Sequence, residues 1–218
     1  MTIYAADVDP DGEEVRFTSY QEGAPNLRPE GVIEWTIDDG VLTLDGTGSS
    51  DADGEIVSHD WYVATAQTDE VYVGEIVEHP IVAQEPLQIT LVVTDDEGLT
   101  DFTTVRIFPM DIKPDSDDNT LNLKAKGVLP VALLSSAVFD ATTIDTTTLR
   151  MGPGQAEVAH PGGHFEDVNG DGLDDLMLHF DIPSLGADKS TTRLCVTGLL
   201  TDGQEFVACD SVTLVGAK

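Results

Sequence analysis

Alternating oxygen-bearing side chains define one short loop, residues 167–175, with the sequence Asp-Val-Asn-Gly-Asp-Gly-Leu-Asp-Asp. A hard cation such as Ca²⁺ takes about six to eight oxygen ligands, and alternate residues of a tight loop can direct oxygens toward one centre. Gly172 allows the bend that wraps such a loop, and the backbone carbonyl of Leu173 supplies a further oxygen. We therefore expect a calcium site whose side-chain ligands are Asp167, Asn169, Asp171 and Asp175.

The residues that follow this loop predict a strand and not the exit helix of an EF-hand. The twelfth loop position, where an EF-hand has a bidentate Glu, is Leu178, and residues 176–180 form the run Leu-Met-Leu-His-Phe. The loop resembles the short calcium loops between strands of integrin-type β-propeller repeats. The alternative is an acidic turn without metal, because Asp, Asn and Gly also favour turns.

The chain is strongly acidic, with 41 Asp and Glu against 10 Lys and Arg and a net charge of −31. Such a surface repels DNA, RNA and anionic membranes, so we expect no nucleic-acid partner. It suits divalent cations, a cationic partner, or saline surroundings in which carboxylates keep the surface hydrated. Salt adaptation therefore stays open beside specific calcium sites.

The 218 residues are enough for one large domain or two of about 100, and an apolar fraction of 40% supports packed cores. No run of about 18 apolar residues occurs, so we expect neither a spanning helix nor membrane insertion. The first residues lack a charged segment followed by an apolar one, so no signal peptide is predicted.

Two cysteines, Cys195 and Cys209, lie on either side of a turn signal at 201–204. If residues 194–200 and 205–214 pair as a hairpin, the cysteines fall near opposite positions, within reach of a disulfide. We favour this bond over two buried thiols. A disulfide indicates an oxidising, extracytoplasmic environment.

Residues 1–30 are expected to be an N-terminal extension or linker. Residues 7–12 (Asp-Val-Asp-Pro-Asp-Gly) fit either a cation loop or an ordinary turn. Residues 14–20 alternate as a strand does, and residues 23–29 have the Gly and Pro content of a linker.

Residues 31–109 show short strands separated by Gly- and Asp-containing turns, a spacing typical of a β-sandwich. The stretch LDGTGSSDADG at 44–54 is followed by Trp61 and then by the turn VTDDEG at 93–98. In these three features the segment resembles PKD (polycystic kidney disease-type) domains. The resemblance implies an Ig-like sandwich that serves as a spacer, adhesion or substrate-docking module and not as a catalyst.

One departure from the PKD pattern follows Trp61, where the family often has Asp-Phe-Gly-Asp-Gly and this chain has Tyr-Val-Ala-Thr. The two acidic turns of the domain are expected at one end of the sandwich, where they could bind a second calcium ion. Its candidate ligands are Asp51, Asp53, Asp95 and Asp96. Acidic turns without metal are the alternative.

Residues 110–218 are expected to form a second calcium-binding β-sandwich. They contain DIKPDSDDNTLN at 111–122, KGVLPVALL at 126–134, FDATTID at 139–145 and GHFEDVNGDGLDDLMLHF at 163–180. This order resembles an uncharacterised domain at the C-termini of secreted microbial proteins, in which Asp115 is usually Gly. The resemblance implies secretion and cation binding, and it places Asp115, Asp117 or Asn119 near a further cation.

Catalytic residues are not evident. His160 and His164 have a spacing used for zinc on helices, but the intervening Pro-Gly-Gly disfavours a helix. The sequence contains no Gly-x-Ser-x-Gly elbow, phosphate loop or Cys/His nucleophile arrangement. Trp35, Trp61 and Tyr62 fit a sugar-stacking platform, but core packing explains at least Trp61 better.

We therefore expect an all-β chain of two Ig-like β-sandwich domains in tandem, belonging to a larger secreted or cell-surface protein. Its predicted role is that of a non-catalytic spacer or adhesion pair that Ca²⁺ makes rigid. Expected partners are neighbouring domains, other surface proteins or polysaccharide. The alternatives are a carbohydrate-binding module that docks a secreted hydrolase on polysaccharide, and a metal-dependent hydrolase in which His160 and His164 meet carboxylates in an open cleft.

Overall fold

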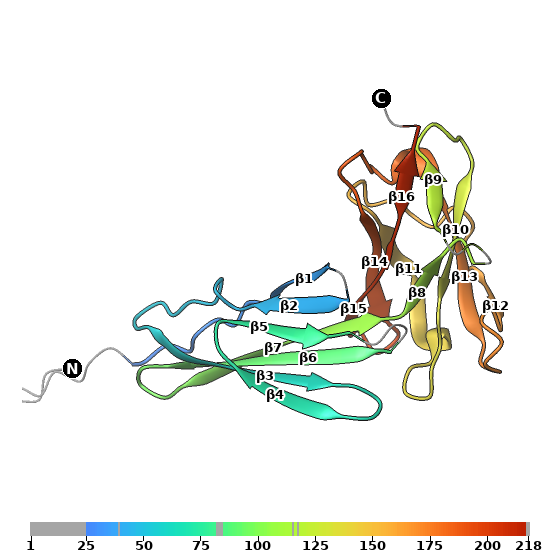
Figure 1. Ribbon diagram of the computed structural model, residues 1–218. Helices are drawn as coiled ribbons and strands as arrows, with labels where there is room; N and C mark the ends of the chain where they lie inside the picture. The colour runs from blue at the N-terminus through green and yellow to red at the C-terminus, as the bar shows by residue number, and fades with distance from the viewer. Residues whose placement is uncertain (1–24, 39, 82–84, 115, 117, 217–218) are drawn as a thin grey trace, which may run out of the picture.

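One seven-stranded sheet runs through the whole structure and belongs to both of its sandwiches (Figure 1). The computed structural model describes residues 25–38, 40–81, 85–114, 116 and 118–216. In this part of the chain the secondary structure is nearly all β, with two short 3₁₀ helices. The predicted fold class, two Ig-like β-sandwiches in tandem, is confirmed.

The first sandwich packs a three-stranded sheet on four strands of the long sheet. The three-stranded sheet has the order β1-β2-β5, with β1 (Glu34–Asp38), β2 (Val41–Asp45) and β5 (Ile76–Pro80). The facing strands are β3 (Ile56–Ala64), β4 (Asp69–Val73), β6 (Leu87–Asp95) and β7 (Thr100–Phe108). Alternate residues of β6 are buried, as expected for a strand with one face on a core. This core is centred on Trp61.

The second sandwich packs a four-stranded sheet on the other three strands of the long sheet. The order of the four is β12-β13-β10-β8, with β8 (Met110–Ile112), β10 (Val128–Leu133), β12 (His164–Glu166) and β13 (Asp175–Asp181). The three are β11 (Ile144–Met151), β14 (Arg193–Leu200) and β15 (Glu205–Ser211). A parallel pair, β9 (Thr120–Asn122) and β16 (Thr213–Val215), and the helices η1 (Ala141–Thr143) and η2 (Ile182–Ser184) complete it.

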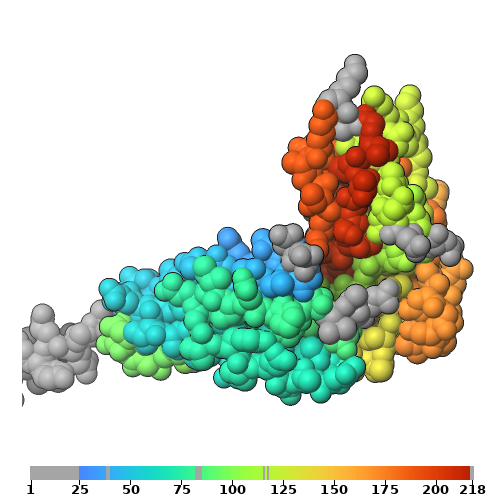
Figure 2. Space-filling model, viewed as in Figure 1, coloured from blue at the N-terminus to red at the C-terminus, as the bar shows by residue number. Residues whose placement is uncertain are grey.

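The two halves of the long sheet are joined by a parallel ladder between β7 and β15. Val207 pairs with Ile107, and Ala208 pairs with Phe108. Successive side chains of a strand point to opposite faces, so Val207 enters the core of the first sandwich and Ala208 that of the second. The sheet thus has one face covered in the first sandwich and the opposite face covered in the second. Figure 2 shows the resulting two lobes.

The core of the second sandwich is the larger of the two hydrophobic clusters. It includes a stacked pair of rings, Phe108 and Phe139, whose centroids are 3.7 Å apart. Phe108 is the last residue of β7, so the second core begins on a strand of the first sandwich. Within the described ranges, no helix has the length and apolar character needed to cross a membrane.

Candidate calcium sites and the domain junction

The loop 167–175 begins directly after β12 and ends at Asp175, the first residue of β13, so the strand predicted after it is present. The loop winds around the carboxylate of Asp167, which accepts hydrogen bonds from the N–H groups of Gly170 (2.8 Å) and Gly172 (3.0 Å). Both glycines have positive φ angles, of 79° and 88°. The bend expected at Gly172 is therefore present, and Gly170 supplies a second one.

Asn169 and Asp171 continue the same winding. The side-chain carbonyl of Asn169 accepts a hydrogen bond from the N–H of Asp171 (3.0 Å), and the carboxylate of Asp171 accepts one from the N–H of Leu173 (2.9 Å). These side chains are exposed, and the Asn169 amide lies 3.2 Å from the second carboxylate oxygen of Asp171. Oxygens at alternate positions of this loop are thus held near one another by local backbone bonds.

Asp175 differs from the other predicted ligands because its side chain is fully buried, with 0% exposure. One carboxylate oxygen accepts a hydrogen bond from the N–H of Ser135 (2.8 Å), and the other accepts one from the N–H of Val168 (2.9 Å). Asp175 therefore ties the start of the loop to the chain that leaves β10. A cation at this residue would have to share oxygens that already hold the backbone.

The donor set of the loop fits calcium in its chemistry, since every candidate is a carboxylate, amide or carbonyl oxygen. Over the part of the chain that the structure describes, no group of three or more His, Cys, Asp or Glu side chains is arranged to hold a metal ion. Asn169 and the carbonyl of Leu173 would have to complete the coordination here. Calcium binding at this loop stays a prediction.

The second predicted cluster is gathered at one end of the first sandwich. Asp96 donates its N–H to the carbonyl of Glu55 (3.0 Å) and accepts the N–H of Glu55 on its carboxylate (3.1 Å), which joins the two acidic turns. Gly54 belongs to the first of these turns, and a Cβ added to it would meet Asp96 Oδ1 at 2.3 Å and Asp51 Oδ2 at 2.7 Å. Two carboxylates therefore approach the position that this glycine leaves open.

Asp95 is 1% exposed, and its hydrogen bonds account for its position. One oxygen accepts the N–H groups of Glu97 (3.0 Å) and Leu99 (2.8 Å), and the other accepts the side-chain amide of Asn26 (3.1 Å). Burial alone would raise the pKa of Asp95, but the hydrogen bonds, led by that from Leu99, bring the pKa below its usual value. Asp95 thus stabilises the turn as an ionised carboxylate.

Two buried oxygens at this end of the sandwich have no hydrogen-bond partner among the described residues: Asp51 Oδ2 and Asn26 Oδ1. A buried oxygen without a partner costs about 1–3 kcal/mol, and more when it is charged. The fourth predicted ligand, Asp53, accepts the N–H of Leu27 (3.2 Å). Asn26 was not predicted from the sequence, because it lies in the segment 23–29, which has the composition of a linker.

Of the third predicted group, Asp115 and Asp117 lie outside the described residues. Asn119 is buried, and its amide donates to the carboxylate of Asp210 (2.8 Å) and to the carbonyl of Ser211 (3.1 Å). The same oxygen of Asp210 accepts the N–H of Ile112 (2.9 Å), so Asp210 links β8, β15 and Asn119. Asn119 Oδ1 has no partner among the residues described.

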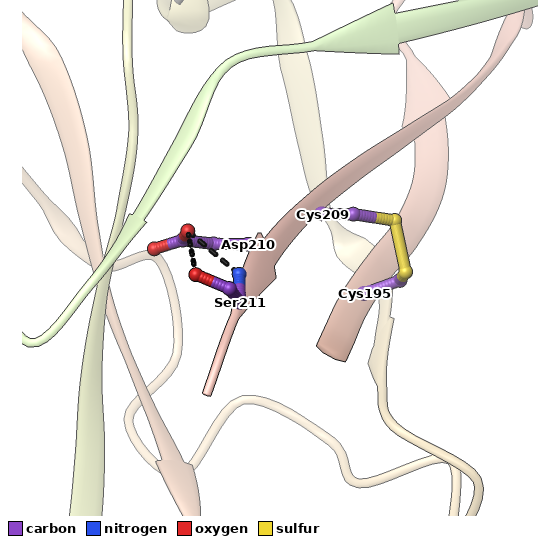
Figure 3. Close-up of a disulfide and its surroundings, with 4 residues drawn as sticks. All are labelled: Cys195, Cys209, Asp210 and Ser211. Carbon is purple, nitrogen blue, oxygen red and sulfur yellow. Dashed lines mark hydrogen bonds between the residues drawn. A yellow bond between two sulfur atoms is a disulfide. The ribbon is translucent and has the colours of Figure 1, made fainter. Parts of the chain in front are cut away.

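The predicted disulfide between Cys195 and Cys209 is present, with an S–S distance of 2.03 Å (Figure 3). The cysteines are directly opposite in the antiparallel ladder of β14 and β15, and their Cα atoms are 4.1 Å apart. Figure 3 also shows the carboxylate of Asp210 accepting the N–H of Ser211 (2.7 Å) at the end of the same strand. Both cysteines pack against the core of the first sandwich, so the bond lies at the junction.

Of the two histidines considered as zinc ligands, His164 is the first residue of β12, and His160 lies in the chain before that strand. His164 Nε2 is 3.0 Å from Glu166 Oε1, and the ring centroids of His164 and His160 are 6.4 Å and 6.2 Å from that of His179. The side chains of His160, His164 and Glu166 are exposed. The structure therefore brings His164 to one carboxylate but does not assemble these histidines into a metal-binding group.

The three aromatic residues considered as a sugar-stacking platform do not lie together. Trp61 is 0% exposed and donates its indole N–H to the carbonyl of Gly74 (2.8 Å), so it belongs to the core. Tyr62, the next residue of β3, faces the opposite side and is 47% exposed. Trp35 lies on the facing sheet, half-buried against the core. A platform of these three residues is therefore wrong, because the strand alternation separates them.

No family model matches the chain, and none of the curated proteins matches it. Among solved structures, the PKD1 domain of Vibrio anguillarum Epp is similar over 38% of this chain and 95% of its own, with 25% identity and a TM-score of 0.34. The PKD1 domain from the Vibrio cholerae metalloprotease PrtV has the same identity and TM-score over 38% of this chain and 98% of its own. Bacteroides ovatus SGBP-B, solved with a mixed-linkage heptasaccharide, is 13% identical over 88% of this chain and 48% of its own, with a TM-score of 0.29. These TM-scores are low, and we draw no conclusion about function from them.

Proposed function

We propose that this chain is a non-catalytic, calcium-binding module of a larger secreted or cell-surface protein, in which two sandwiches act as a rigid spacer or adhesion unit. The PKD-type motifs of residues 31–109 support the first half of this proposal, and the disulfide supports an extracytoplasmic location. The shared sheet supports the rigid arrangement, because the two sandwiches cannot rotate about a linker while β7 and β15 stay paired.

The observation that carries the calcium proposal is the buried carboxylate oxygen of Asp51, which lies beside Asp96 and has no partner among the described residues. The equally unpartnered oxygen of Asn26 lies at the same end of the sandwich, where the Asn26 amide donates to Asp95. Without a cation these oxygens repel one another, and with one their charge is neutralised. Bound calcium would supply positive charge there, while Asp51, Asp96 and Asn26 would supply oxygens from three separate segments. Binding would thereby stabilise the end of the sandwich, because the ligands are assembled only in the folded state.

The test is thermal unfolding of the whole chain in EDTA, in millimolar calcium and in magnesium, each at low and high NaCl. We expect a calcium-specific rise in Tm that saturates with concentration, since a ligand that binds only the folded state stabilises by mass action. Asp51→Asn should remove most of the rise from the first sandwich, and Asp171→Ala the rise from the loop 167–175. Asp188→Asn, which removes one charge at an exposed turn, is the matched control.

If NaCl raised Tm as much as calcium did, the acidic surface would be salt adaptation and the calcium proposal would fail. The proposal would fail likewise if Asp188→Asn and Asp51→Asn reduced the calcium effect equally. The carbohydrate-binding alternative receives no support from Trp35, Trp61 and Tyr62, which the fold separates.

A further inference from the structure

On one face of the long sheet, the part beside β1 is not covered by the sheet β1-β2-β5. Residues in register across a sheet share a face, so Ile107, Val207 and Thr197 lie on the same side. The sheet β1-β2-β5 covers that side over the first sandwich, but β14 and β15 continue beyond its edge, where Thr197 and Glu205 are exposed. A step therefore runs along β1, with the long sheet as its floor.

A groove of about 510 Å³ occupies this step. Its wall is the half-buried indole of Trp35, which extends from β1 toward the floor. The floor comes from the second sandwich, and its groove-lining residues include Thr148, Thr197, Gly198, Glu205 and Val207. Neither sandwich alone forms the groove, so its shape depends on the pairing of β7 with β15.

The strand that borders the groove has one partner only. Among the described strands β1 is paired with β2 and is the edge of its sheet. In an antiparallel ladder, alternate residues turn their N–H and C=O groups away from the partner strand, so these groups of β1 have no ladder partner among the described strands. Edges that must not pair usually have Pro or charged side chains, Lys above all. β1 has the sequence Glu-Trp-Thr-Ile-Asp, with no Pro or Lys and with charged residues only at its two ends.

The charge around the groove is negative. Glu34 on β1 and Glu205 on the floor are exposed, and the nearby cation Arg150 is engaged with Glu157 (3.1 Å). The chain as a whole has a net charge of −31, which attracts cations and repels other acidic chains. An occupant of complementary charge is therefore basic.

We propose that the groove beside β1 binds an extended, basic peptide segment of a partner protein by adding it as a fourth strand next to β1. Main-chain hydrogen bonds to β1 supply affinity, and alternate side chains of the peptide contact Trp35 and the floor residues Thr148 and Thr197. The five residues of β1 can pair with a segment of about five residues, roughly 16 Å long. The proposal goes beyond the spacer role and does not depend on calcium.

The probe is the peptide acetyl-Lys-Val-Lys-Val-Lys-Val-Lys-amide, titrated into the whole chain in EDTA and in calcium, with tryptophan fluorescence and calorimetry as readouts. Because a strand added to β1 offers only every second N–H to it, two isomers methylated on alternate backbone nitrogens should differ. We expect one isomer to bind as the parent does and the other to bind about tenfold or more weakly. The D-enantiomer, which has the same charge, should show a similar loss.

The protein variants separate the groove from general attraction. Thr197→Arg places a bulky cation on the exposed floor and should weaken binding by about tenfold or more, whereas Thr213→Arg on the distant strand β16 should reduce it only slightly. Hydrogen exchange should show peptide-dependent protection of β1 amides. Equal binding of both methylated isomers and the D-enantiomer, equal effects of the two arginine variants, or no saturable binding in low salt would each overturn the proposal.

Discussion

Val207 of β15 lies directly beside Ile107 of β7, in a parallel ladder between residues one hundred positions apart in the chain. This pair joins the two halves of the seven-stranded sheet and places a side chain of the second half in the core of the first. The sandwiches therefore share a structural element as well as a surface.

Shortening Val207 should weaken both sandwiches together. We expect Val207→Ala to lower the free energy of unfolding by about 2 kcal/mol, from lost apolar burial and a small cavity. Val215→Ala, at a position that is 42% exposed, is the control and should change it by less than about 0.5 kcal/mol. Urea unfolding followed by tryptophan fluorescence measures both, and equal effects would show that Val207 does not support the junction.

Removing the disulfide should lower the free energy of unfolding by more than Val207→Ala does. Cys195 and Cys209 are 14 positions apart in the sequence, and closing a loop of about this length destabilises the unfolded chain by about 3 kcal/mol. We expect the double variant Cys195→Ala/Cys209→Ala to lose about 2–4 kcal/mol and to melt at a lower temperature in the absence of reductant. Reducing the disulfide of the native protein should lower its Tm to about that of the double variant. Unchanged stability in the double variant would show that the β14–β15 ladder alone holds this region.

Substitutions of Asp175 and of Asp171 should distinguish a residue that supports the fold from one that binds metal. In EDTA, Asp175→Ala leaves the N–H groups of Ser135 and Val168 without their acceptor, which should cost about 2–4 kcal/mol. The neighbouring exposed Asp174→Ala is the matched control. Asp171→Ala should have little effect in EDTA and a clear effect in calcium. Equal losses for Asp174→Ala and Asp175→Ala in urea unfolding would contradict the anchoring role.

Acid should destabilise the fold through carboxylates that cap turns. The hydroxyl of Thr142 (2.7 Å), followed by its N–H (2.9 Å), donates to Asp140 and lowers the pKa of that carboxyl below its usual value. A lowered folded-state pKa contributes stability above the unfolded value of about 3.9, and this contribution is lost as the pH falls through the folded value.

The stability difference between the native chain and Thr142→Val should therefore be constant from about pH 5 to 7 and shrink below about pH 4. Thr213→Val, at an exposed strand position, controls for the general effect of losing a hydroxyl. A difference that stays constant into acid would show that the Thr142 hydroxyl does not stabilise the Asp140 carboxylate.

The predictions that the structure confirms were based on short local patterns in the sequence. The apolar run after the loop predicted β13, and the turn between the cysteines predicted their opposite register, because both depend on neighbours in the chain. The division into domains at residue 109 rests on the same kind of pattern and stays a prediction. Core packing was the favoured prediction for Trp61, and its complete burial confirms it.

Long-range relationships were not predictable in this way. A parallel ladder of two residue pairs between β7 and β15 has no sequence signature, because its partners are brought together only by the fold of everything between them. Asn26 lies in a segment with the composition of a linker, yet it donates to Asp95 across 69 positions. Asp210 joins Asn119 to β8. It could not be singled out from the sequence, because the chain has 41 acidic residues and residue type alone does not show which of them make such contacts.

Because the two sandwiches share a sheet, the chain connection at Pro109 is not their only link. Pro109 is the only residue between β7 and β8, but β7 also pairs with β15, and the Cys195–Cys209 disulfide packs against the first core. We therefore expect two fragments produced by a protease cut at Pro109 to stay associated, as the halves of a split protein do. The ladder between β7 and β15 and the contacts of Val207 with the first core are thus a second connection between the sandwiches, beside the chain itself.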